Sequence, residues 1–156
     1  MNKIELAYNK TLKLSNVLIF EIKLNEETNI DREITQMENF IKSKGAIPIG
    51  PLIQKTVYQT GESGEPVIRI YLMRQVNTFI YKIESPYTME SVIRVRNCAY
   101  VRYTGPEEKI KFGYDKINVD AFEKGIELAN ENYTIFVDKQ DDTIIADIFV
   151  EKKSDD

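Results

Sequence analysis

Alternating apolar positions predict the first strong strand over residues 16–24, NVLIFEIKL. Every second residue from Leu18 to Leu24 is apolar, and a period of two places these side chains on one face of an extended chain. The other face carries Val17, Ile19, Glu21 and Lys23. We therefore expect a strand with two different faces.

The pattern then changes to the spacing of a helix. Thr28 is the expected N-cap, because Asp31 stands three residues later as in an acidic capping box. Gly45 is expected just beyond the last turn, where glycine adopts the left-handed conformation that ends many helices. The apolar positions between them are Ile30, Ile34, Met37 and Ile41.

Two more strands are predicted at residues 52–58 and 67–74, with the polar segment 60–66, TGESGEP, as the turn between them. The connector that follows, residues 76–91, is expected to contain a strand at 79–84 that Pro86 ends. Another strand is expected to begin near Val92. The first half therefore follows the order strand–helix–strand–strand.

The same order recurs in the second half. A strand is predicted at 98–104, and Pro106 with two following glutamates predicts a helix start, because acidic residues suit the positive end of the helix dipole. Gly125 closes this helix as Gly45 closes the first, and strands follow at 133–138 and 143–150. The apolar positions of the helix are Ile110, Tyr114, Ile117 and Ala121.

These elements predict an α+β protein with one domain over residues 1–156 and a duplicated strand–helix–strand–strand module. The two copies are expected at about 13–75 and 92–153, joined by the connector 76–91. The order of elements carries this inference, because the residues themselves differ between the copies.

A sheet with helices on one face leaves its other face to be explained. In the last strand of each copy, Ile68, Ile70 and Leu72, and Ile144, Ala146 and Ile148, should face the helix. The opposite face then collects aromatic and apolar side chains with a few charges, which suits a groove for an amphipathic or cationic small molecule. Its predicted members are Glu21, Arg69, Tyr71, Met73, Tyr100, Arg102, Asp147 and Phe149.

Composition narrows the chemistry that this face can perform. The 156 residues include no histidine, which excludes Ser-His-Asp catalysis and histidine-bearing metal sites. The single cysteine, Cys98, excludes a four-thiolate zinc site and an intrachain disulfide, and we expect it to be inert packing. We therefore predict no catalytic residue, no metal ligand and no cofactor.

Charge and hydropathy indicate the compartment of the protein and which classes of partner it lacks. The net charge of −4 argues against a general nucleic-acid binder, because phosphate neutralisation needs a basic surface. No apolar run approaches the roughly 20 residues of a membrane span. Charged residues, Lys3 and Glu5 among them, interrupt the N-terminus before a signal peptide could form. We therefore expect a cytoplasmic protein with neither nucleic acid nor membrane as partner.

Several segments resemble the GyrI-like superfamily of small-molecule-binding domains, which also serve as effector-binding regions of bacterial multidrug-responsive transcription activators. NCAYVRYTGPEEKI resembles the family's strand that ends in Arg-x-x-Gly-Pro and leads into a long helix. AFEKGIELANENYTIFVD is similar to the end of that helix and the next strand, and GAIPIGP to the family's Gly-x-Pro turn. TIIADIFVEK is similar to the terminal strand, with the acid and the aromatic in place but Glu151 where the family has proline.

The resemblance implies two βαββ modules related by a pseudo-twofold axis, with antiparallel sheets backed by two long helices and a ligand groove between the modules. In effector-binding members a buried glutamate in the groove meets cationic drugs, and its matching position here is Asp147, one methylene shorter. Some relatives are hydrolases that open strained small molecules with a groove carboxylate. A related branch lies near specialised secretion loci. We expect no DNA-binding helix-turn-helix before the domain.

The favoured function is therefore binding of an apolar small molecule, which can be neutral or cationic. Enzymatic activity is left open. A protein-interaction accessory, linked to a secretion locus, and a hydrolase of strained electrophiles, acting through Glu21 and Asp147, are the alternatives. For Asp147 itself, the alternative to a ligand counter-charge is an ion pair with Arg69 or Arg102, or a carboxylate that is simply solvated. The predicted ligand-binding residues are Glu21, Arg69, Tyr71, Tyr100, Arg102, Asp147 and Phe149.

Overall fold

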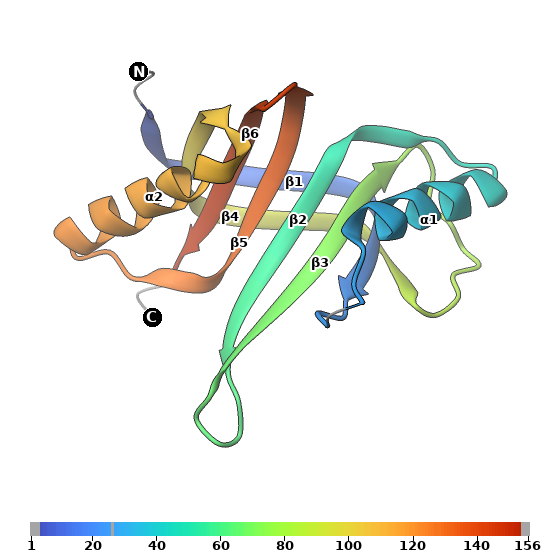
Figure 1. Ribbon diagram of the computed structural model, residues 1–156, viewed down its shortest axis with the longest axis horizontal. Coiled ribbons are helices and arrows are strands. Elements are labelled where there is room, and N and C mark those ends of the chain that lie inside the picture. Colours follow the sequence, from blue (N-terminus) through green and yellow to red (C-terminus); the bar gives the residue numbers. More distant parts are fainter. Residues whose placement is uncertain (1–3, 26, 154–156) are drawn as a thin grey trace. The chain divides into compact units, whose positions relative to one another are not determined.

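The computed structural model describes residues 4–25 and 27–153 (Figure 1). These residues form two compact units, one of residues 13–93 (the first unit) and one of the described residues up to Leu12 and from Arg94 onward (the second unit). The α+β class predicted from the sequence is confirmed. The elements in chain order are β1 (Leu6–Ile22), α1 (Ile30–Ser43), β2 (Pro48–Thr60), β3 (Pro66–Val76), β4 (Tyr87–Pro106), the short 3-10 helix η1 (Glu107–Lys109), α2 (Lys111–Glu123), β5 (Leu128–Gln140) and β6 (Thr143–Lys152).

In the first unit, β3 lies between β1 and β2 and pairs antiparallel with both. Met37 and Ile41 of α1 are fully buried, as the predicted spacing requires, whereas Ile30 at the helix start is exposed and departs from it. Leu72 of β3 belongs to the same core, but Ile68 is 49% exposed, so the predicted helix-facing row ends before it. The buried core of this unit consists of Leu18, Ile22, Met37, Ile41, Ala46, Leu72, Val76 and Ile80.

In the second unit, β6 lies between β4 and β5 and again pairs antiparallel with both. Ile144, Ala146 and Ile148 are buried as predicted, and Ile148 packs in one cluster with Ile117 of α2. Strand order and element order therefore recur between the units. Duplication from one ancestral module and pseudo-twofold symmetry stay predictions.

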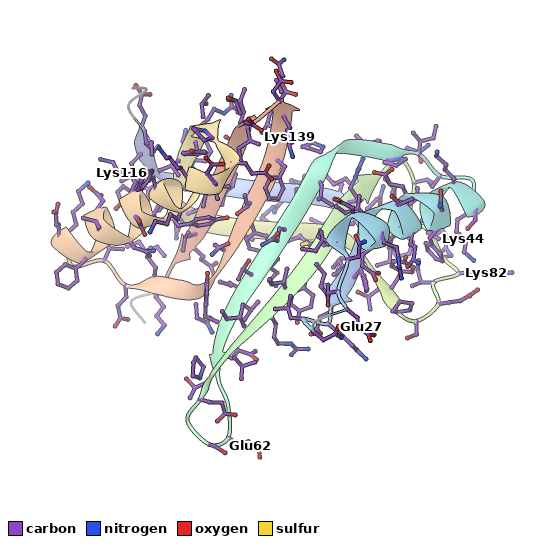
Figure 2. The ribbon with its side chains drawn as sticks, in the orientation of Figure 1. Glu27, Lys44, Glu62, Lys82, Lys116 and Lys139 are labelled. Atoms are coloured by element: carbon purple, nitrogen blue, oxygen red, sulfur yellow. The ribbon has the colours of Figure 1, made fainter. Side chains whose placement is uncertain are left out.

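Both helices end in the same hydrogen-bonding motif. Gly45 has φ +74° and Gly125 has φ +68°, and their N–H groups donate to Lys42 and Phe122 three residues back. The next N–H in each case reaches the carbonyl five residues back, which completes a Schellman motif. The predicted helix ends are confirmed. Lys44, labelled in Figure 2, places its charge at the negative end of α1, and its ammonium lies 3.6 Å from Glu84.

Several boundaries differ from the prediction. The N-cap of α1 is Asn29, whose side chain accepts the Arg32 N–H at 3.1 Å, whereas the Thr28 hydroxyl donates to the Lys23 carbonyl. β1 begins at Leu6, ten residues before the predicted start. Residues 79–84 form no strand, and β4 begins at Tyr87 rather than near Val92. Among residues 4–25 and 27–153, neither helix is long and apolar enough to cross a membrane.

Candidate functional site

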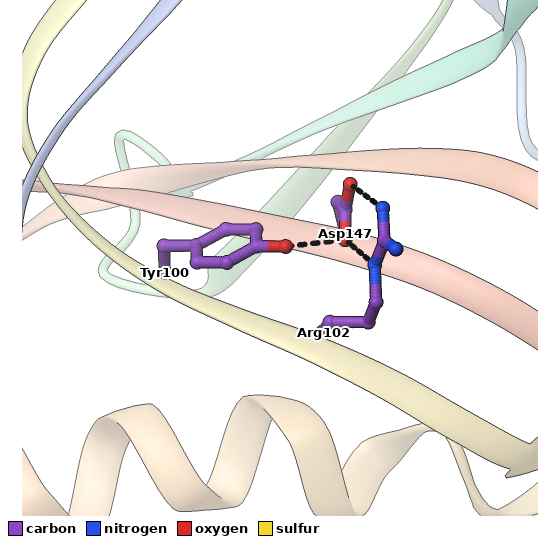
Figure 3. Close-up of polar contacts among 3 residues, drawn as sticks. All are labelled: Tyr100, Arg102 and Asp147. Carbon is purple, nitrogen blue, oxygen red and sulfur yellow. Dashed lines mark hydrogen bonds and ion pairs between the residues drawn. The ribbon is translucent and has the colours of Figure 1, made fainter. Parts of the chain in front are cut away.

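Four of the predicted site residues come together on β4 and β6 of the second unit. Figure 3 shows three of them, Tyr100, Arg102 and Asp147. In the register of this strand pair, Arg102 lies directly opposite Asp147, and Tyr100 lies directly opposite Phe149. Because Ile148 faces α2 and side chains alternate along a strand, Asp147 and Phe149 lie on the face away from α2. We call these four residues the β4–β6 cluster.

The polar half of the β4–β6 cluster is fully interconnected. The Arg102 guanidinium donates from Nε to Asp147 Oδ1 at 2.8 Å and from Nη2 to Oδ2 at 3.0 Å. The Tyr100 hydroxyl donates to the same Oδ1 at 2.8 Å. The two-pronged geometry is the strong form of an arginine–carboxylate contact. These bonds raise the pKa of Arg102, and burial followed by the bond to Asp147 raises the pKa of Tyr100.

The aromatic half of the cluster forms a wall beside this ion pair. The rings of Tyr100 and Phe149 lie 4.9 Å apart, centroid to centroid, at an interplanar angle of 40°. Both side chains are partly exposed. The Asp147 side chain is 15% exposed and that of Arg102 is 53% exposed. The arrangement therefore offers a ligand aromatic surface next to a charge pair whose cationic member faces solvent.

The three remaining predicted residues come together in the first unit. Arg69 donates to both carboxylate oxygens of Glu21, with its Nε 2.9 Å from Oε2, and this bond raises the pKa of Arg69. The Arg69 guanidinium also lies 5.8 Å from the centre of the Tyr71 ring. Lys55, which the sequence reasoning missed, lies opposite Tyr71 in the β2–β3 register, with its ammonium 5.8 Å from the same ring.

Each predicted acid is therefore already held by an arginine of its own unit. For Asp147 the structure shows the ion-pair alternative, with Arg102 rather than Arg69 as the partner. Within the part of the chain that the structure describes, no group of three or more acidic or cysteine side chains is placed to hold a metal ion. The β4–β6 cluster, and likewise the group of Glu21, Arg69 and Tyr71, offers aromatic contact and fixed charge.

Cys98 lies on β4 near the β4–β6 cluster in sequence, but it is fully buried. Burial raises the pKa of its thiol to about 11. We expect the thiol reagent dithiobis(nitrobenzoate) at pH 8 to label the folded protein at least a hundredfold more slowly than the unfolded chain. Folding lowers the thiolate fraction on the order of a hundredfold, and it also covers the sulfur. The same reaction in guanidinium chloride supplies the reference rate. Equal rates in the two conditions would contradict a buried, neutral thiol.

A separate depression of about 860 Å³ lies along α2 in the second unit. Phe112, Val119 and Tyr103 contribute its apolar surface, and Lys109, Asp115 and Lys116 contribute charges. None of the seven predicted site residues lines it. Substitutions in this depression can therefore serve as controls for the predicted site.

Comparison with known proteins identifies solved structures that share this fold. Neither a protein-family model nor a curated protein matches this chain. Among solved structures, the EcmrR C-terminal domain superposes with a TM-score of 0.67 at 18% identity, covering 97% of this chain and 98% of that one. EcmrR in its complex with DNA gives a TM-score of 0.65 at 19% identity, and this chain spans 58% of its length. A hydrolase from Listeria innocua gives a TM-score of 0.57 at 8% identity, covering 97% of this chain and 92% of that one.

The structural matches agree with the sequence motifs on one family of folds. The likeness extends over nearly the whole of this chain, and over nearly the whole of the EcmrR C-terminal domain. At such low identity the likeness shows the fold alone. The ligand, reaction and partners of this chain must be inferred from its own residues. The chain has the fold of the EcmrR C-terminal domain.

Proposed function

We propose that this protein binds an apolar, aromatic small molecule on the β4–β6 cluster. The single observation that carries the proposal is the paired Tyr100 and Phe149 rings, partly exposed and flanked by the Arg102–Asp147 ion pair. Aromatic surface beside a few fixed polar groups is the usual composition of a small-molecule site. The fold shared with the EcmrR C-terminal domain supports the same function. Glu21, Arg69 and Tyr71 repeat the combination of ion pair and ring in the first unit, and the groove between modules stays a prediction.

The experiment is a binding screen with polyaromatic compounds, read by thermal shift and confirmed by equilibrium dialysis. A ligand at a hundredfold excess over its Kd should stabilise the protein by about 2.7 kcal/mol. Tyr100→Ala and Phe149→Ala should each weaken binding at least tenfold, because they remove the ring surface.

Two matched controls locate the site. Tyr81→Ala removes a tyrosine that is 87% exposed in the first unit and should leave binding unchanged. Phe112→Ala alters the depression along α2 and should also leave it unchanged. Loss of binding in Phe112→Ala but not in Phe149→Ala would move the site to α2 and contradict the proposal.

A second function, that of a protein-interaction accessory, is favoured by apolar side chains on the surface of α2. Val119 is 56% exposed and Phe122 is 87% exposed. Exposed apolar patches of this kind mark protein contacts. Capture of one stoichiometric protein that Phe122→Ser abolishes, without any small-molecule response, would support this function over the first. A hydrolase is less favoured, because arginine already holds the carboxylates of Glu21 and Asp147; turnover of a strained electrophile would support it.

A further inference from the structure

The position that a cationic ligand would take beside Asp147 is already filled. A carboxylate offers about four lone-pair sites. Here Arg102 uses two of them and Tyr100 a third, all at 2.8 to 3.0 Å. The Asp147 side chain is only 15% exposed, so little of its surface is left for another partner. A cation that used Asp147 as counter-charge would have to replace Arg102.

The backbone holds Arg102 in this place. Arg102 and Asp147 are direct cross-strand partners in the β4–β6 ladder. The register of the two strands therefore places the guanidinium beside the carboxylate. Moving the guanidinium away breaks two charge-assisted hydrogen bonds and leaves a mostly buried carboxylate with the Tyr100 hydroxyl alone. The ion pair is therefore a fixed part of the cluster.

The cationic side of this ion pair faces outward. The Arg102 side chain is 53% exposed, whereas its carboxylate partner is mostly covered. Arg102 donates to Asp147 through Nε and Nη2, and among the described residues its Nη1 has no hydrogen-bond partner. The Tyr100 and Phe149 rings and this outward-facing positive charge therefore belong to one cluster.

We propose that Arg102 acts as a resident counter-ion which reverses the charge preference of the cluster, so that it selects anionic over cationic aromatic ligands. This inference rests on the proposed function. The sequence resemblance implied a cationic ligand for Asp147. The built-in Arg102 occupies that role, and its outward-facing positive charge favours an anion with an apolar aromatic body.

The test uses two probes of nearly equal shape and opposite charge, tetraphenylborate and tetraphenylphosphonium, with Kd measured by equilibrium dialysis. The wild-type protein should bind the borate at least tenfold more tightly than the phosphonium. Arg102→Gln should reverse this order, because it removes the resident cation and frees Asp147. Asp147→Asn should keep the preference for the borate, since Arg102 then stands without its counter-charge.

Arg96→Gln is the matched control, because Arg96 is an exposed arginine on the same strand and its loss changes net charge equally. It should leave the order of the probes unchanged. Thermal melts confirm that each variant is folded, and Asp147→Asn keeps the test valid should Arg102→Gln fail to fold. A wild-type preference for phosphonium, or equal effects of Arg102→Gln and Arg96→Gln, overturns the inference alone. Absence of borate binding to the wild type, when polyaromatic ligands lacking charge also fail to bind, overturns the proposed function with it.

Discussion

Replacing Ile148 by alanine is expected to lower the free energy of unfolding by about 3 to 4 kcal/mol. Ile148 is fully buried on the α2-facing side of β6, in a cluster with Val101 and Ile117. The substitution removes three carbon atoms and leaves a cavity that α2 and the sheet can close only in part. Urea unfolding followed by circular dichroism measures the change.

Ile68→Ala is the control for this prediction. Ile68 lies on β3 and is 49% exposed, so the same three atoms should be worth only about 1 kcal/mol there. Equal losses in the two variants would show that Ile148 does not belong to a packed core.

Side-chain periodicity predicted the centre of most elements, and a left-handed backbone position explains why it missed the start of β1. In β1, Leu12 and Leu14 are buried at a spacing of two, but burial then moves to Val17 and Leu18. Asn16 between them has φ 49°, which shifts the alternation from one face to the other. A strict period-two pattern cannot pass such a residue, so the predicted strand began at Asn16 rather than at Leu6.

The connector shows a second limit. Residues 79–84 alternate as a strand would, but a strand exists only where another strand pairs with it, and pairing is not a local property of the sequence. Instead, Ile80 is buried in the core of the first unit with Ile83 packed against it, while Tyr81 stays 87% exposed. The predicted strand was therefore wrong, although two of its apolar residues contribute to the core.

For the β4–β6 cluster, sequence reasoning placed the four side chains on one face of a sheet but could not determine their partners. Alternation alone brings Tyr100, Arg102, Asp147 and Phe149 to the same side of a sheet. Which of two arginines reaches Asp147 depends on the cross-strand register, which sets Arg102 opposite it. Lys55 was missed for the same reason, although its place opposite Tyr71 would follow once the β2–β3 register is known.

Replacing Gly113 is expected to produce the second large loss of stability, because the absence of a side chain at this position lets α2 approach the sheet closely. A Cβ atom built on this buried glycine would lie 2.8 Å from Ile148 Cδ1 and 3.4 Å from Tyr103 Cβ. Gly113→Val is therefore expected to cost about 2 to 3 kcal/mol through overpacking. Asn118→Val, at an exposed position of the same helix, should change the free energy of unfolding by only a few tenths of a kcal/mol, because asparagine and valine have similar helix propensities.

The double variant Gly113→Val with Ile148→Ala distinguishes overpacking from a general disturbance of α2. The valine at 113 would extend into the space that Ile148 vacates, so each change relieves part of the damage of the other. We expect the double variant to be more stable than the sum of the single losses predicts by about 1 kcal/mol or more, as measured by urea unfolding of all four proteins. Additivity within about 0.5 kcal/mol would contradict direct packing of Gly113 against Ile148, and with it the close approach of α2 to the sheet that carries Asp147 on its other face.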